Sequence, residues 1–137
     1  MKYGQSVVVF PTSTREETPE GIVFNDVTPT EGVVIIAVSE IIRSGATTKA
    51  EIDEDFGVIP PIPDSSAQPF AVEFLLENLD LASGYWYLVD ALSFPDPGVG
   101  LLWILSSDRR FFGTTFRIRC RHASEVAAKY SVSIRFF

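Results

Sequence analysis

The stretch Phe116-Arg117-Ile118-Arg119-Cys120-Arg121 alternates apolar residues and arginines without a break. Successive side chains of a β-strand point to opposite faces, so this alternation predicts a strand with one buried face and one cationic face. Residues 130–136 repeat the pattern, with serine and arginine at the polar positions. We expect the two strands to pair as a hairpin through residues 122–125, with an apolar inner face and an arginine-serine outer face.

Further segments of the chain also have the features of short strands. Runs of β-branched and aromatic residues predict strands at residues 7–10, 22–24, 33–42, 85–92 and 101–105. Proline early and glycine late in residues 28–32 favour a hairpin turn. Residues 58–64 hold three prolines, which cannot donate backbone hydrogen bonds, so this segment is expected to cross between sheets.

Residues 69–79 fit two kinds of structure. Apolar residues alternate from Phe70 to Leu76, as they do in a half-buried strand. The same positions also stand four apart, and Pro69 and Gly84 would suit the two ends of a helix. Phenylalanine and valine favour a pleated surface, so we predict a strand and leave the helix as the alternative.

The fold class follows from the number of these segments. A chain of 137 residues has the size of one domain, and 46% hydrophobic with 21% charged residues provides enough apolar surface for a folded core. About eight short strands separated by turns predict an all-β protein. The expected architecture is a single-domain antiparallel β-sandwich over residues 1–137, either immunoglobulin-like or a jelly roll.

Part of the chain resembles a known family of sandwiches. Residues 102–107, residues 112–116 and Cys120 resemble the E-to-F passage of immunoglobulin-like domains, and the expected terminal hairpin resembles their F–G pair. Small sandwiches of this kind are similar to the decoration, fibre-base and tail-accessory subunits of phage virions. They are also similar to adhesin and carbohydrate-binding modules. The resemblance implies a binding or structural role.

The residues that usually carry catalysis or bind metals are scarce in this chain. It has one histidine, His122, and one cysteine, Cys120. We expect His122 to be a solvated residue at a hairpin tip and Cys120 to be a buried, inert thiol. The acidic run Asp53, Glu54 and Asp55 does not have the spacing of a calcium loop, because Gly57 stands at the third ligand position. No enzymatic activity, metal or other cofactor is therefore expected.

Charge is distributed unevenly along the sequence. The net charge is −7, which disfavours binding to nucleic acid or to an anionic membrane, but residues 101–137 hold 7 basic and 2 acidic residues. Arg117, Arg119, Arg121 and Arg135 are expected on one outward face, where guanidinium groups can bind carboxylates. Two sources of carboxylates remain open. One is an acidic strand of the same sheet, and the other is an acidic partner such as the Asp53, Glu54 and Asp55 loop or residues 16–20 of another copy.

Assembly with other proteins is the function that these features favour. We predict a non-enzymatic structural protein, a small phage virion subunit that decorates a capsid or serves as a tail accessory, binding capsid or tail subunits and copies of itself. Besides the arginines, Phe136 and Phe137 are expected to be exposed and to dock on the partner. Without a visible export signal or membrane span, the chain is expected to assemble into virions in the host cytoplasm.

A carbohydrate or cell-surface binding module is the alternative. Aromatic side chains stack on sugar rings, and an aromatic platform is the feature that would support this function. Alternation predicts that Trp86 lies on a core-facing side of its strand, which weakens the platform. The candidate platform residues are Tyr85, Trp86, Tyr87 and Trp103.

Overall fold

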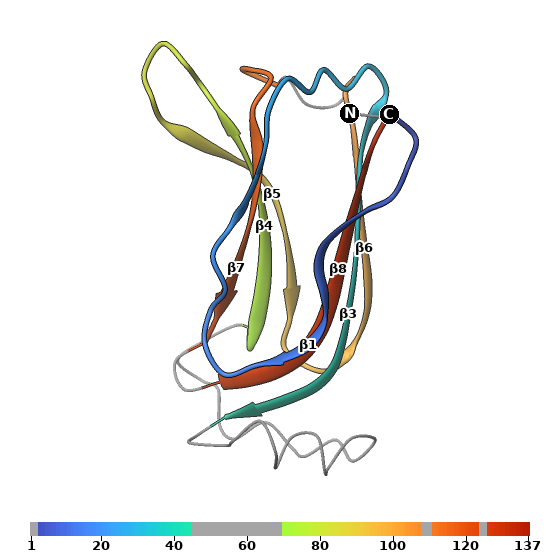
Figure 1. Ribbon diagram of the computed structural model, residues 1–137, viewed down its shortest axis with the longest axis vertical. Coiled ribbons are helices and arrows are strands. Elements are labelled where there is room, and N and C mark those ends of the chain that lie inside the picture. Colours follow the sequence, from blue (N-terminus) through green and yellow to red (C-terminus); the bar gives the residue numbers. More distant parts are fainter. Residues whose placement is uncertain (1–2, 45–69, 108–110, 124–125) are drawn as a thin grey trace.

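The computed structural model describes residues 3–44, 70–107, 111–123 and 126–137, which form eight strands in two facing antiparallel sheets (Figure 1). Sheet A has the strand order β1-β8-β3-β6 and sheet B has the order β2-β7-β4-β5. None of the described residues forms a helix long and apolar enough to span a bilayer. The strands are β1 (Val7–Arg15), β2 (Ile22–Phe24), β3 (Gly32–Ser44), β4 (Val72–Leu79), β5 (Trp86–Phe94), β6 (Gly98–Leu105), β7 (Phe116–His122) and β8 (Val126–Phe136).

The pairing of the strands is nested. β1 pairs with β8, β2 with β7, β3 with β6 and β4 with β5. The chain is thus a long antiparallel ribbon that turns back at the β4–β5 hairpin and is rolled into two sheets, which is a jelly roll. An immunoglobulin sandwich instead keeps its first two strands side by side. The predicted all-β sandwich is confirmed as a jelly roll, and the immunoglobulin-like topology is wrong.

Two predicted hairpins are also wrong. β7 and β8 lie in opposite sheets, so residues 116–122 and 126–136 do not pair with each other. Residues 28–32 likewise lead from β2 in sheet B to β3 in sheet A. Alternation identifies the buried face of a strand but not the strand beside it. Residues 69–79 contain the strand that we favoured over a helix, and the predicted crossover at residues 58–64 lies outside the described residues.

The core lies between the two sheets and is rich in aromatic rings. Phe74 of β4 packs edge-to-face against Tyr130 of β8, with ring centroids 5.1 Å apart, and Phe116 of β7 packs against Phe136 of β8 at 5.6 Å. These four side chains are each at most 1% exposed. Burying a large apolar side chain contributes about 1.5–3 kcal/mol, so these contacts across the interface hold the sheets together.

Glycine permits a close approach of β3 and β6 where their pairing begins. A Cβ atom added to Gly32 would lie 2.3 Å from the carbonyl oxygen of Ile104. No side-chain rotation can relieve that clash, because the carbonyl oxygen is a backbone atom and a Cβ atom is bonded directly to the backbone. At Gly98, the other end of the same ladder, an added Cβ would meet no atom within 4 Å.

We predict that Gly32→Ala lowers the free energy of unfolding by about 1–3 kcal/mol, because the new methyl group forces β3 away from β6. Gly98→Ala is the matched control, and its effect should stay within about 0.5 kcal/mol. Urea denaturation followed by circular dichroism measures both. Equal stability of the two variants would contradict the close approach at Gly32.

Candidate functional site

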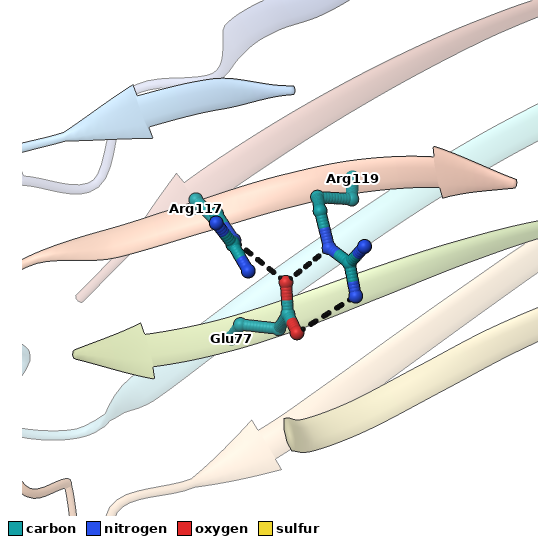
Figure 2. Close-up of polar contacts among 3 residues, drawn as sticks. All are labelled: Glu77, Arg117 and Arg119. Atoms are coloured by element: carbon teal, nitrogen blue, oxygen red, sulfur yellow. Dashed lines mark hydrogen bonds and ion pairs between the residues drawn. The ribbon is translucent and has the colours of Figure 1, made fainter. Parts of the chain in front are cut away.

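A carboxylate on β4 holds two of the predicted site arginines on the outer face of sheet B. The Arg117 Nε atom donates to Glu77 Oε1 at 2.7 Å, and Arg119 donates to both carboxylate oxygens, with Nη2 at 3.0 Å from Oε2 (Figure 2). The β4–β7 register places Glu77 directly opposite Arg117. Cross-strand neighbours share a face, so the pairing follows from the register.

The third arginine of β7 is bound in the same way. Arg121 Nη2 donates to Glu73 Oε2 at 2.8 Å, and these residues are also register partners. Two aromatic rings lie under the guanidinium groups. The Cζ atom of Arg117 is 4.2 Å from the centroid of the Trp86 ring, and the Cζ atom of Arg121 is 4.8 Å from the centroid of the Phe70 ring. Cation–π contact adds to the ion pairs.

The arginines of β7 therefore bind carboxylates of their own sheet, the first of the two sources that the sequence left open. Glu77 is 6% exposed although it carries charge. Burial raises its pKa, but the hydrogen bonds from Arg119 and Arg117 outweigh burial and hold the pKa below the usual 4.5. The carboxylate is therefore ionised at neutral pH. A partner's carboxylates docking on this arginine row would compete with Glu73 and Glu77 of the same chain.

Three expectations about the end of the chain are corrected or refined by the structure. The sequence predicts Arg135 on the same face as the β7 arginines, and this prediction is wrong. Arg135 lies on β8, opposite Val34, in the other sheet. Phe136 is 1% exposed and belongs to the core, so it is not a docking residue. Its alternation with Ile134 already indicated an inward position. Phe137 is half-buried, and its ring lies against Trp103 with centroids 5.4 Å apart.

The four predicted platform aromatics do not come together. Trp103 lies on β6 of sheet A, whereas Trp86 and Tyr87 lie on β5 of sheet B. Trp86 is half-buried beneath Arg117 on the outer face of its sheet, so its expected core position is wrong. Tyr87 packs against Phe112 at 4.9 Å, and Tyr85 is 69% exposed near the β4–β5 tip, which leans away from the sandwich (Figure 1). A shared platform is therefore wrong.

A hydrogen-bonded network between the sheets joins His122, Tyr130 and Cys120. The Tyr130 hydroxyl oxygen lies 2.8 Å from His122 Nε2 and 3.1 Å from Cys120 Sγ. His122 Nδ1 lies 3.1 Å from the Val126 carbonyl oxygen, which can only accept, so Nδ1 carries the proton. Nε2 then accepts from Tyr130, and the thiol donates to the Tyr130 oxygen.

These hydrogen bonds connect β7 of sheet B to β8 of sheet A. Cys120 is 4% exposed, which confirms the predicted burial of the thiol, and burial raises its pKa to about 12. His122 was expected to be solvated, but the structure places it half-buried against Tyr130, and burial lowers its pKa. The prediction failed because β7 and β8 lie in opposite sheets, so His122, at the end of β7, lies against Tyr130 of β8.

The outer face of sheet A carries six exposed apolar side chains, and others, Ile22, Val23, Tyr87 and Leu88, lie on the edge strands of sheet B. A row of register partners crosses all four strands from Val8 through Ser133 and Ile36 to Leu101. Along β6, every second side chain points outward and is exposed. We call the following six residues the apolar face, with their exposed fractions: Val8 64%, Ile36 40%, Val99 74%, Leu101 60%, Trp103 50% and Leu105 37%.

Two shallow grooves lie on this face, and Ser133 of β8 lines both of them. One groove lies between Ile36, Trp103 and Phe137, and the other between Val8, Pro11 and Val38. Residues 34–38 and 98–105 contain no charged side chain. Alternation does not reveal this face, because β6 is apolar or glycine at every position, a pattern that indicates a strand buried on both sides.

No metal site is formed by the part of the chain that the structure describes, where no three histidine, cysteine or acidic side chains gather. The predicted partner-binding residues Asp53, Glu54 and Asp55 lie outside that part.

Comparison with known proteins gives only distant structural likenesses. No protein-family model matches the sequence, and no curated protein matches it. Two solved structures of cowpea mosaic virus particles are similar to the fold. One describes naturally occurring empty particles of the top component (12% identity, 96% of this chain and 83% of that chain covered, TM-score 0.32), and the other an empty virus-like particle (11% identity, 96% and 78% covered, TM-score 0.31).

We predict that Glu77→Gln lowers the free energy of unfolding by about 1–3 kcal/mol at neutral pH, because it removes the charged acceptor shared by two arginines. Exposed Glu31→Gln is the control and should change it by no more than about 0.5 kcal/mol. The folded pKa of Glu77 lies below the unfolded value of 4.5, so its contribution is complete above that pH and is lost as the pH falls through the folded pKa. Urea titrations at several pH values measure this. If both variants lost as much free energy of unfolding in acid as the wild type does, the prediction would be contradicted.

We also predict that His122 makes the fold sensitive to mild acid. Its folded pKa lies below the unfolded value of 6.5, so protons bind preferentially to the unfolded chain. Stability is unaffected above that pH and falls progressively below it, until folded His122 also titrates. Thermal denaturation from about pH 7.5 to about pH 5.5 should show this loss in the wild type and a flatter profile in His122→Gln. An unchanged profile in the variant would assign the acid sensitivity to other groups.

Proposed function

We propose that this protein is a non-enzymatic assembly protein that binds other protein subunits through the apolar face of sheet A. The observation that carries the proposal is the gathering of exposed apolar side chains on one sheet. Val99, Leu101 and Trp103 are each at least half exposed and are neighbours on β6. Exposed apolar patches of this kind are found at protein interfaces, because covering them is favourable.

The contrast between the two sheets supports this choice of surface. On sheet B, Glu73 and Glu77 satisfy the β7 arginines within the chain. On sheet A, Arg135 and two serines stand beside the exposed apolar residues. An apolar patch bordered by polar side chains is typical of a docking surface, in which apolar contact supplies affinity and the polar border gives orientation.

A non-enzymatic role is supported by the state of the chain's one cysteine and one histidine. The Cys120 thiol is buried and protonated, and His122 is engaged at both ring nitrogens. Neither of them faces a groove of the apolar face. Catalysis needs a base or nucleophile within reach of a substrate, and these two groups lack that access.

We further propose that the assembly is a virus particle and that the chain is a small virion subunit, with phage capsid decoration or a tail accessory as the specific form. The jelly roll is an architecture of viral capsid proteins, and this fold-level analogy supports the proposal. Jelly rolls also occur in lectins. The carbohydrate-binding alternative loses its support from the sequence, because Trp103 lies in a different sheet from Tyr85, Trp86 and Tyr87.

We predict that the protein in extracts of its native source sediments with a particle much heavier than its own 15.2 kDa. Ile36→Lys places a charge in the middle of the apolar face and should move the protein to the light fractions of a sucrose gradient. Leu81→Lys is the control, because Leu81 is 74% exposed at the tip of the β4–β5 hairpin of sheet B. Sedimentation of the wild type as a free chain would contradict the assembly role, and retention of Ile36→Lys in the particle would exclude this face.

A further inference from the structure

The free edges of the two sheets differ in how they are protected against pairing with another strand. Edge strands present unpaired backbone N–H and C=O groups, and proteins block such edges with prolines, charges, bulges or short strands. β1 contains Pro11 and has two register shifts against β8. β2 is three residues long. β5 carries Asp90, and its ladder with β4 is interrupted at Leu76/Glu77.

β6 has none of these features. Its residues, Gly98–Leu105, include no charge and no proline. The register with β3 is unbroken over eight pairs, from Gly32↔Leu105 to Ser39↔Gly98. Among the strands that the structure describes, β3 is its one pairing neighbour, so β6 forms an edge of sheet A (Figure 1). A regular, neutral and apolar edge strand is a template for a further strand.

We propose that β6 pairs with β6 of a second copy of this chain, antiparallel, about a two-fold axis. Two observations select a second copy. The strand is its own complement, because a two-fold axis brings the same edge into antiparallel register with itself, as in an isologous interface. The composition of β6 also fits a second copy: the strand has no charged side chain, so pairing with itself brings no like charges opposite each other and sets apolar side chains against apolar side chains.

The alternation of β6 limits the register. Val99, Leu101, Trp103 and Leu105 point outward, whereas Leu102 and Ile104 are less exposed on the inner side. Opposed residues of an antiparallel pair share a face, so the axis must pass through a residue and not between two residues. Leu101 and Leu102 are the two positions at the middle of the strand. An axis at Leu101 sets Trp103 opposite Val99, and an axis at Leu102 sets it opposite Leu101.

The resulting dimer would contain a continuous eight-stranded sheet. Its outer surface would join the two apolar faces, with Ile36, Leu101 and Trp103 of each copy near the seam. The inference rests on the proposed function and deepens it: the assembling unit would be a pair of chains that offers one extended apolar surface. Pairing of β6 with β6 would cover the free edge of sheet A, and the apolar face would remain available to bind further subunits.

Analytical ultracentrifugation of the purified chain tests the pairing. The wild type should shift from one to two chain masses as its concentration rises. Leu101→Lys sets lysines close together at the seam and should weaken the dimer by at least about tenfold. Val8→Lys is the matched control: Val8 is 64% exposed on the same face but lies on β1, at the opposite edge, and its dimer should persist.

Amide hydrogen exchange gives a second readout that depends on backbone pairing. In the wild type and in Val8→Lys, amides of residues 98–105 should exchange more slowly at high than at low protein concentration, whereas Leu101→Lys should show no such difference. Loss of the dimer in both variants would indicate face-to-face packing and overturn edge pairing. A wild type that stays monomeric at every concentration would also overturn it. Neither result bears on sedimentation with a native particle, which tests the proposed function separately.

Discussion

Pairing of β4 with β7 decides which charged side chains of sheet B have partners within the chain. It sets Glu77 opposite Arg117 and Glu73 opposite Arg121, and both carboxylates are hydrogen-bonded to β7 arginines. The charged side chains of sheet B thus satisfy one another above a layer of apolar and aromatic residues. The β7 arginines therefore have carboxylate partners within their own sheet, and the six residues of the apolar face lie on the other sheet.

Sheet A combines two features that have the same physical origin. Its outer face is apolar from β3 to β6, and β6 ends the sheet without a charge, a proline or an irregular register. Both apolar side chains and unpaired backbone groups are more stable when covered. The apolar face and the free edge therefore both support the proposed binding of protein partners, and they meet on β6.

The interior contains a polar tie that couples the two sheets. Tyr130 on β8 is 0% exposed, and its hydroxyl group bonds to His122 and Cys120 of β7. Arg15 lies over the same ring, 4.5 Å from its centroid. A buried hydroxyl group is costly without partners, so these residues depend on one another. The predicted loss of stability in mild acid has the same origin, because His122 accepts the Tyr130 hydrogen bond only when its ring is neutral.

Local sequence patterns predicted most of the strands and the buried face of β7. Alternation from Phe116 to Arg121 correctly placed Cys120 inside and the arginines outside, and the segment at 69–79 was correctly favoured as a strand. Period-two patterns are local, so they can be read without knowing the neighbours. Tertiary structure alone decided which strands pair. It separated Arg135 from Arg117, supplied the glutamates of β4, and left β6 at an edge, because strand order depends on contacts between residues far apart in the chain.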